Sequence, residues 1–275
     1  MSRTQLHFEP IAGALGAEVS GIDLREPLAP EVQKELHDGW MEHLVLFFRE
    51  QPVSRDEHKD FARNFGELHV HPVLHPLKDE GHPEIVVLAS DEKRKFVADR
   101  WHSDVTFQRV PPLGSILHGV KVPAAGGDTM WANMYAAYEA LSNTMQRLLS
   151  DLRALNDGGG FRIIASERGK QDLEADVTAL HPVVRTHAVT GRKGLFVNSS
   201  FTKEIDGMKP AESRALLRFL FKHIDQPEFA CRFRWRDHSI AMWDNRCTQH
   251  RVVRDNLRDL RHMERVTIVG DGPPQ

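Results

Sequence analysis

The sequence predicts a mainly β core with a few helices packed outside it. Three observations lead to this expectation: several short apolar runs, turn-forming residues between them, and a smaller number of segments with helical spacing. Many short strands separated by turns are typical of a sandwich, a jelly roll or a barrel. Because no internal repeat, low-complexity tract or linker interrupts the chain, we expect residues 1–275 to form a single domain.

The N-terminal third combines helices with a buried strand. Residues 30–43 have helical spacing and begin with a proline, whose ring suits the first helical turn. The apolar run 44–48 is typical of a buried strand. A second helix is expected over 55–65, because Ser54 and Glu57 have the spacing of a capping box.

The same patterns predict the remaining elements. The other expected strands span residues 84–88, 112–122, 182–187, 194–198, 229–235, 239–243 and 264–269. The other expected helices span residues 134–150 and 210–224. Irregular polar segments are expected at 90–100 and, after a glycine-rich break, at 156–180.

The composition argues against several classes of protein. A net charge of −3 does not favour binding to nucleic acid or to a membrane surface. No apolar stretch approaches the roughly 18 residues of a transmembrane helix. The N-terminus lacks the apolar core of a signal peptide, and two cysteines are too few for a disulfide framework. We therefore expect a cytoplasmic protein.

Two histidines and one carboxylate form a candidate metal site. His102 and Asp104 are two residues apart, so in a strand they would project from the same side. His250 ends a later strand-and-loop segment and can supply the third ligand. This ligand set is typical of non-haem Fe(II), and it leaves positions open for a cosubstrate and O2. The alternatives are a zinc site or a hydrogen-bonded His–Asp pair at a strand edge.

Two arginines at the predicted final strand are candidate anion-binding residues. Arg261 and Arg265 are four residues apart, so both side chains would point the same way. Buried guanidinium groups are costly unless anions pair with them, and their planar fork suits carboxylate or sulfonate. A dicarboxylate cosubstrate and an anionic substrate would supply that charge, with the hydroxyl of Thr129 sharing the carboxylate with Arg261. The alternative is that one or both arginines pair with acidic side chains at the surface and that Thr129 is an ordinary strand residue.

Longer motifs then resemble a known family. The sequence is similar to the taurine dioxygenase group of Fe(II)/2-oxoglutarate-dependent oxygenases, which includes phenoxyalkanoate and alkylsulfate dioxygenases, from residue 13 to residue 271. The motifs are FGELHVHP (65–72), WHSDVTF (101–107), GGDT (126–129), HPVVRTH (181–187) and WDNRCTQH (243–250). The resemblance implies a double-stranded β-helix, a jelly-roll variant, in a homodimer or homotetramer.

The resemblance also implies a role for each candidate residue. The implied Fe(II) ligands are His102, Asp104 and His250. The implied partners of the 2-oxoglutarate C5 carboxylate are Thr129 and Arg261. The implied neighbours of the substrate are Arg265, His71, the backbone NH of Val105, and Phe201.

Two positions depart from the taurine pattern. Leu74 and Ala98 stand where taurine dioxygenases have Tyr and Asn, so the pocket is expected to be roomier and more apolar. The loss of two polar contacts weakens discrimination for a small zwitterion. We expect hydroxylation of a small anion, such as taurine or a related alkylsulfonate, giving succinate and CO2. A phenoxyalkanoate or alkylsulfate dioxygenase is the alternative, and a non-catalytic jelly-roll binding module or a zinc hydrolase lies outside this class.

Overall fold

A seven-stranded sheet forms one half of the protein. The computed structural model describes residues 6–71, 73–74, 77, 80–93, 98–161, 177–256 and 258–275. The sheet has the order β1-β2-β3-β13-β5-β15-β4, in which β2 and β3 are parallel and the other neighbours are antiparallel. Its strands are β1 (His7–Pro10), β2 (Ala17–Ser20), β3 (Val45–Phe48), β4 (Val86–Ser90), β5 (Gly114–Lys121), β13 (Ile240–Asp244) and β15 (Arg261–Ile268).

Smaller sheets make up the rest of the β structure. One has the order β12 (Ala230–Phe233), β6 (Thr129–Asn133) and β14 (Thr248–Val252). Another has the order β11 (Thr202–Ile205), β7 (Arg153–Asp157) and β8 (Thr178–Pro182). A hairpin joins β9 (Val184–Thr186) to β10 (Lys193–Leu195).

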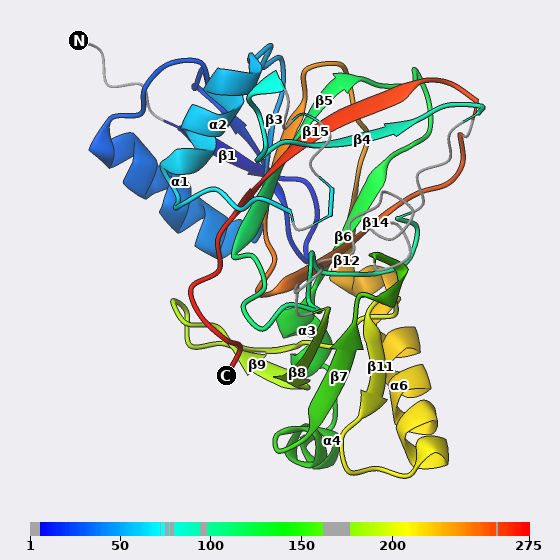
Figure 1. The fold of residues 1–275 in the computed structure, drawn as a ribbon. Helices are drawn as coiled ribbons and strands as arrows, with labels where there is room; N and C mark the ends of the chain where they lie inside the picture. The colour runs from blue at the N-terminus through cyan, green and yellow to red at the C-terminus, as the bar shows by residue number, and fades with distance from the viewer. Residues whose placement is uncertain are drawn as a thin grey trace.

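The helices lie on the outside of these sheets. They are α1 (Pro30–His43), α2 (Arg55–Arg63), α3 (Met134–Glu139), α4 (Asn143–Leu149), α6 (Pro210–Ile224) and the short 3-10 helix η2 (Pro227–Phe229). Figure 1 shows α1 and α2 beside the seven-stranded sheet in the upper part of the molecule, and α6 beside β11 in the lower part. The predicted class, a mainly β core with flanking helices, is confirmed.

The seven-stranded sheet separates two hydrophobic cores, which explains why its central strands are apolar on both faces. Leu46 and Phe48 of β3 pack in the core beneath α1 and α2. Val45 and Phe47 alternate with them and face the sheet of β12, β6 and β14, which is the three-stranded sheet referred to below. There Phe47 stacks on Phe233 with ring centroids 4.1 Å apart. The face toward the three-stranded sheet is the one that carries the candidate site.

Several predicted elements are confirmed by the structure. The helix at 30–43 is α1, and the strands expected at 182–187 and 194–198 are β9 and β10, which pair in an antiparallel hairpin. The capping box of α2 is present, because the Ser54 hydroxyl accepts from the Glu57 backbone NH and the Glu57 carboxylate accepts from the Ser54 backbone NH. The final strand was predicted too short, since β15 begins at Arg261 rather than at 264.

Other expectations were wrong. The single helix expected over 134–150 is two helices, since the Ser142 hydroxyl accepts from the Met145 NH and begins α4 as a new helix. The irregular segment expected to begin at residue 156 begins later, because β7 continues to Asp157. Gly158 then packs against Phe107, where a Cβ atom would lie 2.6 Å from the ring. Much of the two expected polar segments, residues 94–97 and 162–176, lies outside the described residues.

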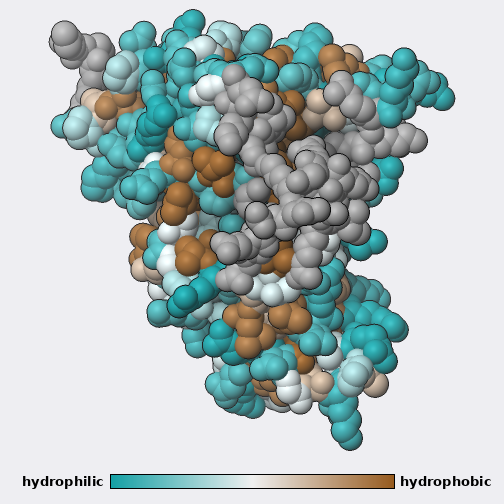
Figure 2. Space-filling model, viewed as in Figure 1, coloured by the Kyte–Doolittle hydropathy of each residue, from teal (hydrophilic) through white to brown (hydrophobic). Residues whose placement is uncertain are grey.

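No helix within the described ranges has the length and apolar character needed to cross a membrane. The face drawn in Figure 2 is largely hydrophilic, with hydrophobic side chains in small patches between the upper and lower parts of the molecule.

Two histidines buried between α2 and the sheet should make stability sensitive to acid. Burial lowers the pKa of His58 to about 3 and that of His118 to about 4, from an ordinary value of 6.5. Both are therefore neutral in the folded protein, whereas the unfolded chain takes up protons below pH 6.5. The free energy of unfolding should fall as pH decreases from 6.5 toward 4, by about 1 kcal/mol per pH unit for each histidine.

Urea unfolding at pH 7, 6 and 5 measures this dependence. The His118→Leu variant removes one of the two groups, so its free energy of unfolding should fall less steeply between pH 6.5 and 4. An unchanged slope would contradict the prediction.

Candidate active site

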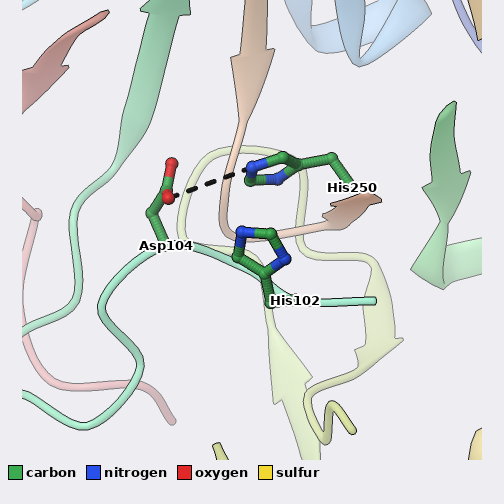
Figure 3. Close-up of side chains that lie close together, drawn as sticks. All are labelled: His102, Asp104 and His250. Carbon is green, nitrogen blue, oxygen red and sulfur yellow. Dashed lines mark ion pairs between the residues drawn. The ribbon is translucent and has the colours of Figure 1, made fainter. Parts of the chain in front are cut away.

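The three predicted metal ligands lie together. His102 and His250 form an isolated β-bridge, in which the backbone NH of each donates to the carbonyl of the other at 3.1 and 2.8 Å. Their ring centroids are 4.2 Å apart. Asp104 was expected in a strand, but it lies in the turn that follows His102. Figure 3 shows that it still points toward the His250 ring, with its Oδ1 atom 3.9 Å from Nε2.

The chemistry of this cluster fits a divalent metal. One ligand atom from each of His102, Asp104 and His250 lies within 4.8 Å of the other two, and all three residues are buried. His102 Nδ1 donates to the carbonyl of Arg100 at 2.8 Å, so Nε2 keeps the lone pair that a metal needs. Burial lowers the pKa of both histidines, which keeps them neutral at neutral pH.

The Asp104 carboxylate is held in its ionised form. Burial opposes its ionisation, but the charges of Arg265 and the two histidines and the hydrogen bond from Ser115 together outweigh this effect and lower the pKa of Asp104. Arg265 donates from Nη1 to Oδ1 of Asp104. On the other side, the Ser115 hydroxyl donates to Oδ2 at 2.7 Å, and Asn245 Nδ2 donates to the Ser115 hydroxyl at 3.0 Å. The Ser115 proton must therefore point to the carboxylate, which fixes the orientation of Asp104.

Removing the Ser115 hydroxyl should weaken metal binding. In the Ser115→Ala variant we expect metal affinity to fall about 10- to 100-fold, the usual effect of losing a hydrogen bond that orients a ligand. Titration with Mn(II) followed by electron paramagnetic resonance measures this affinity. Ser103→Ala is the matched control, because the Ser103 hydroxyl donates to the Thr248 carbonyl and not to Asp104. Equal affinities in wild type and both variants would contradict the prediction.

Arg261 and Thr129 form a second polar group near the cluster. Arg261 donates from Nε to the Gly127 carbonyl at 3.0 Å and from Nη2 to the Thr129 hydroxyl at 3.4 Å. Burial lowers the pKa of Arg261 to about 10, so the guanidinium is still cationic at neutral pH. Within the described residues, no carboxylate lies within ion-pair distance of it. A buried cation of this kind is stabilised when an anion arrives to pair with it.

One cavity joins the metal cluster to both arginines. It has a volume of about 220 Å³, and residues of the seven-stranded and three-stranded sheets contribute to its walls. All the residues selected from the sequence line it: His71, Leu74, Ala98, His102, Asp104, Val105, Thr129, Phe201, His250, Arg261 and Arg265. Six further lining residues were not predicted from the sequence: Leu88, Leu117, Phe161, Ser200, Trp243 and Val252.

The sequence matches a known family. The family described as "Taurine catabolism dioxygenase TauD, TfdA family" matches residues 7–267. This chain belongs to the TauD/TfdA family. The resemblance seen in its motifs is therefore confirmed.

Relatives of this TauD/TfdA protein extend over nearly its whole length. It is 34% identical to an alkylsulfatase from Acinetobacter baylyi, over 97% of this chain and 86% of the relative. It is 36% identical to an alpha-ketoglutarate-dependent 2,4-dichlorophenoxyacetate dioxygenase from Cupriavidus pinatubonensis, over 95% of this chain and 97% of the relative. The crystal structure of AAD-2 in complex with Mn(II) and N-oxalylglycine superimposes with a TM-score of 0.80 and 31% identity, covering 98% of this chain and 100% of that one.

The far side of the cavity in this TauD/TfdA protein is aromatic and apolar. His71 Nδ1 accepts from the backbone NH groups of Val73 and Leu74 at 3.1 and 2.9 Å, so a neutral His71 carries its proton on Nε2 as a donor. Its ring lies 5.2 Å from that of Phe161, and Phe161 lies 6.3 Å from Phe201. Phe161 follows the glycine-rich break at 158–160, which was the one signal in the sequence that could have drawn attention to it.

Val105 has an unusual backbone beside the metal cluster. Its φ angle is +53°, in the left-handed region that β-branched residues rarely adopt. Such a conformation costs about 1–3 kcal/mol and persists where the surrounding structure imposes it. It turns the chain directly after Asp104, so that both residues line the cavity.

Proposed function

We propose that this protein is an Fe(II)- and 2-oxoglutarate-dependent dioxygenase that hydroxylates a small organic anion. The observation that carries the proposal is the cluster of His102, Asp104 and His250 in one cavity with two buried arginines, Arg261 and Arg265. A zinc hydrolase or a non-catalytic binding module has no need of a second buried cation positioned for a dicarboxylate. The 2-oxoglutarate dependence named for the 2,4-dichlorophenoxyacetate dioxygenase relative supports the same reaction class.

The proposed roles follow from the donors present. His102, Asp104 and His250 would hold Fe(II) on one face, and Thr129 and Arg261 would bind the C5 carboxylate of 2-oxoglutarate. Together with O2, these groups supply an oxidation in which one oxygen atom enters the substrate as hydroxyl and 2-oxoglutarate becomes succinate and CO2. The Mn(II) and N-oxalylglycine bound to the structural relative support a metal and a dicarboxylate at this kind of site.

The remaining donors would orient the substrate. Arg265 keeps its Nε atom buried and without a partner among the described residues, and a neutral His71 carries its proton on Nε2. Together they would bind the anionic group and aim one C–H bond at the metal, which is the main contribution that positioning makes to rate. If the hydroxylated carbon bears a sulfonate, sulfate or aryl-ether oxygen, the product fragments.

The first candidate substrate is a sulfonate such as taurine or a related alkylsulfonate. A second candidate, an alkyl sulfate or a phenoxyalkanoate, is favoured by the walls of the cavity. Leu74 and Ala98 line it without offering side-chain hydrogen bonds, and Phe161 and Phe201 add aromatic surface. Such a wall suits a larger apolar tail behind the anionic group.

Anaerobic addition of 2-oxoglutarate to the Fe(II)-loaded protein tests the reaction class. Chelation of the metal by a 2-oxo acid should produce a metal-to-ligand charge-transfer band in the visible spectrum. Absence of this band in protein that is fully loaded with Fe(II) would contradict the proposal.

A screen for succinate release tests the substrate class. Sulfonates, alkyl sulfates and aryloxyalkanoates are compared at equal concentration, and at least one group should stimulate succinate formation above the uncoupled background. Background-level succinate with every anion would contradict the assignment of a small organic anion.

We further propose that residues 1–275 form a single domain with the double-stranded β-helix fold. The seven-stranded and three-stranded sheets facing each other across the cavity, and the likeness of the whole chain to AAD-2, support this proposal.

A further inference from the structure

The indole NH of Trp235 contacts the candidate cosubstrate site from the side of the protein core. Trp235 follows β12, and Phe233 of that strand pairs directly with Thr129 of β6. Trp235 Nε1 donates to the Thr129 hydroxyl at 2.9 Å. The Trp235 side chain is buried in the core between the two sheets, so its NH is out of contact with water and depends on this acceptor.

The hydroxyl of Thr129 has only three hydrogen-bonding positions, which are two lone pairs and one proton. Trp235 donates to one lone pair at 2.9 Å, and Arg261 Nη2 donates to the other at 3.4 Å. The proton therefore has to point away from both donors. In the described parts of the chain no acceptor is within hydrogen-bond distance of it, and Thr129 lines the cavity.

We propose that Trp235 is a positioning residue that turns the Thr129 proton into the cavity, toward the far carboxylate of 2-oxoglutarate. This inference rests on the proposed binding of that cosubstrate by Thr129 and Arg261. Without the indole NH, the hydroxyl is free to rotate and to use its proton elsewhere. Part of its hydrogen bond to the carboxylate is then lost, and ordering the hydroxyl on binding costs entropy.

The chain contains a matched control for this role. Trp131 lies in the same core, with its ring 6.4 Å from that of Trp235. Its side chain is also buried, but its Nε1 atom has no hydrogen-bond partner among the described residues. A change from Trp to Phe removes the same atoms at both positions, whereas only the change at Trp235 removes a donor to Thr129.

The decisive experiment compares two cosubstrates in the Trp235→Phe variant. Calorimetry on the Mn(II)-loaded protein gives the Kd for 2-oxoglutarate and for 2-oxopentanoate, which has a methyl group in place of the C5 carboxylate. We expect 2-oxoglutarate to bind about 3- to 10-fold more weakly than to wild type, the usual effect of one hydrogen bond, while the Kd for 2-oxopentanoate is unchanged. In turnover, the KM for 2-oxoglutarate should rise by the same factor, with kcat nearly constant.

The controls separate positioning from packing. Trp131→Phe should leave the ratio of the two Kd values at the wild-type level. In a Thr129→Val background, Trp235→Phe should weaken 2-oxoglutarate binding no further, because the hydroxyl that it orients is already absent. An equal loss for both cosubstrates, an unchanged Kd for 2-oxoglutarate, or a full additional loss in the Thr129→Val background would overturn the proposal.

Folding is checked by circular dichroism for every variant, with Trp235→Tyr as a second substitution that keeps a large aromatic ring. Loss of folding in both Trp235 variants would assign this residue a structural role and also overturn the proposal. Binding of 2-oxoglutarate by wild type tests the proposed function separately from the positioning role. If wild type does not bind 2-oxoglutarate, the proposed function fails, whereas equal binding by wild type and Trp235→Phe defeats only the positioning role.

Discussion

Replacing Asp104 with alanine should abolish succinate release, with a loss on the order of 10³-fold or more. The variant removes the only carboxylate of the His102–Asp104–His250 cluster and leaves the buried Arg265 without the partner that it has in the structure. Metal affinity should fall as well, because two neutral histidines beside an unpaired guanidinium are a poor site for a divalent cation. Succinate assays and Mn(II) titration measure the two effects separately.

Asp99→Ala is the matched control for this change. Asp99 lies in the same segment of the chain, but its carboxylate forms an ion pair with Arg254 away from the metal cluster. It is partly exposed, so the pair contributes little to stability. Activity within a few-fold of wild type is expected for Asp99→Ala. Substantial succinate release by Asp104→Ala at wild-type metal loading would exclude Asp104 as a ligand.

Replacing Arg261 with alanine should raise the concentration of 2-oxoglutarate that the enzyme needs by about 100-fold or more. Losing one partner of a buried charge pair costs about 2–5 kcal/mol, and in this variant the cosubstrate carboxylate would be buried without its cation. The charge-transfer band should then appear only at much higher 2-oxoglutarate concentration, whereas saturating cosubstrate should restore most of the turnover. Titration of the band under anaerobic conditions gives this affinity directly.

Arg232→Ala provides the corresponding control. Arg232 lies on β12, next to the strand that carries Thr129, but its exposed guanidinium pairs with Asp128 and Asp255. This variant should bind 2-oxoglutarate nearly as wild type does. If Arg261→Ala and Arg232→Ala shift the affinity equally, the effect belongs to the surrounding sheet and not to a carboxylate contact.

The parts of the fold that could be predicted are those encoded locally. The apolar run at 44–48 indicated a strand covered on both faces, and Ser54 and Glu57 indicated where a helix begins. The four-residue spacing of Arg261 and Arg265 placed both side chains on one face, because alternation along a strand depends only on the backbone. The helix over 134–150 was mispredicted because a hydrophobic pattern does not reveal a new start at Ser142.

The residues of the candidate site differ in how they were predicted: some from the sequence itself, some from the family resemblance, and some not at all. Every residue selected from the sequence lines the cavity, but His71, Leu74, Ala98, Val105 and Phe201 were selected through the family resemblance rather than from the residues alone. Ser115 and Trp235 were missed, since nothing near them in the sequence distinguishes them from ordinary core residues, and Phe161 was missed although it follows the glycine-rich break at 158–160. Their importance comes from contacts with Asp104, His71 and Thr129, which lie far away along the chain.

The sequence by itself determined the chemical groups and their local direction: two histidines, one carboxylate, two arginines on one strand face, and a wall without the polar groups expected for taurine. Only the tertiary structure decided which of these groups meet. The bridge between His102 and His250, the contact of Arg265 with Asp104 and the indole NH behind Thr129 all depend on strand register and on how two sheets face each other. Side-chain spacing is a property of a few neighbouring residues, whereas register is set by the packing of the whole core.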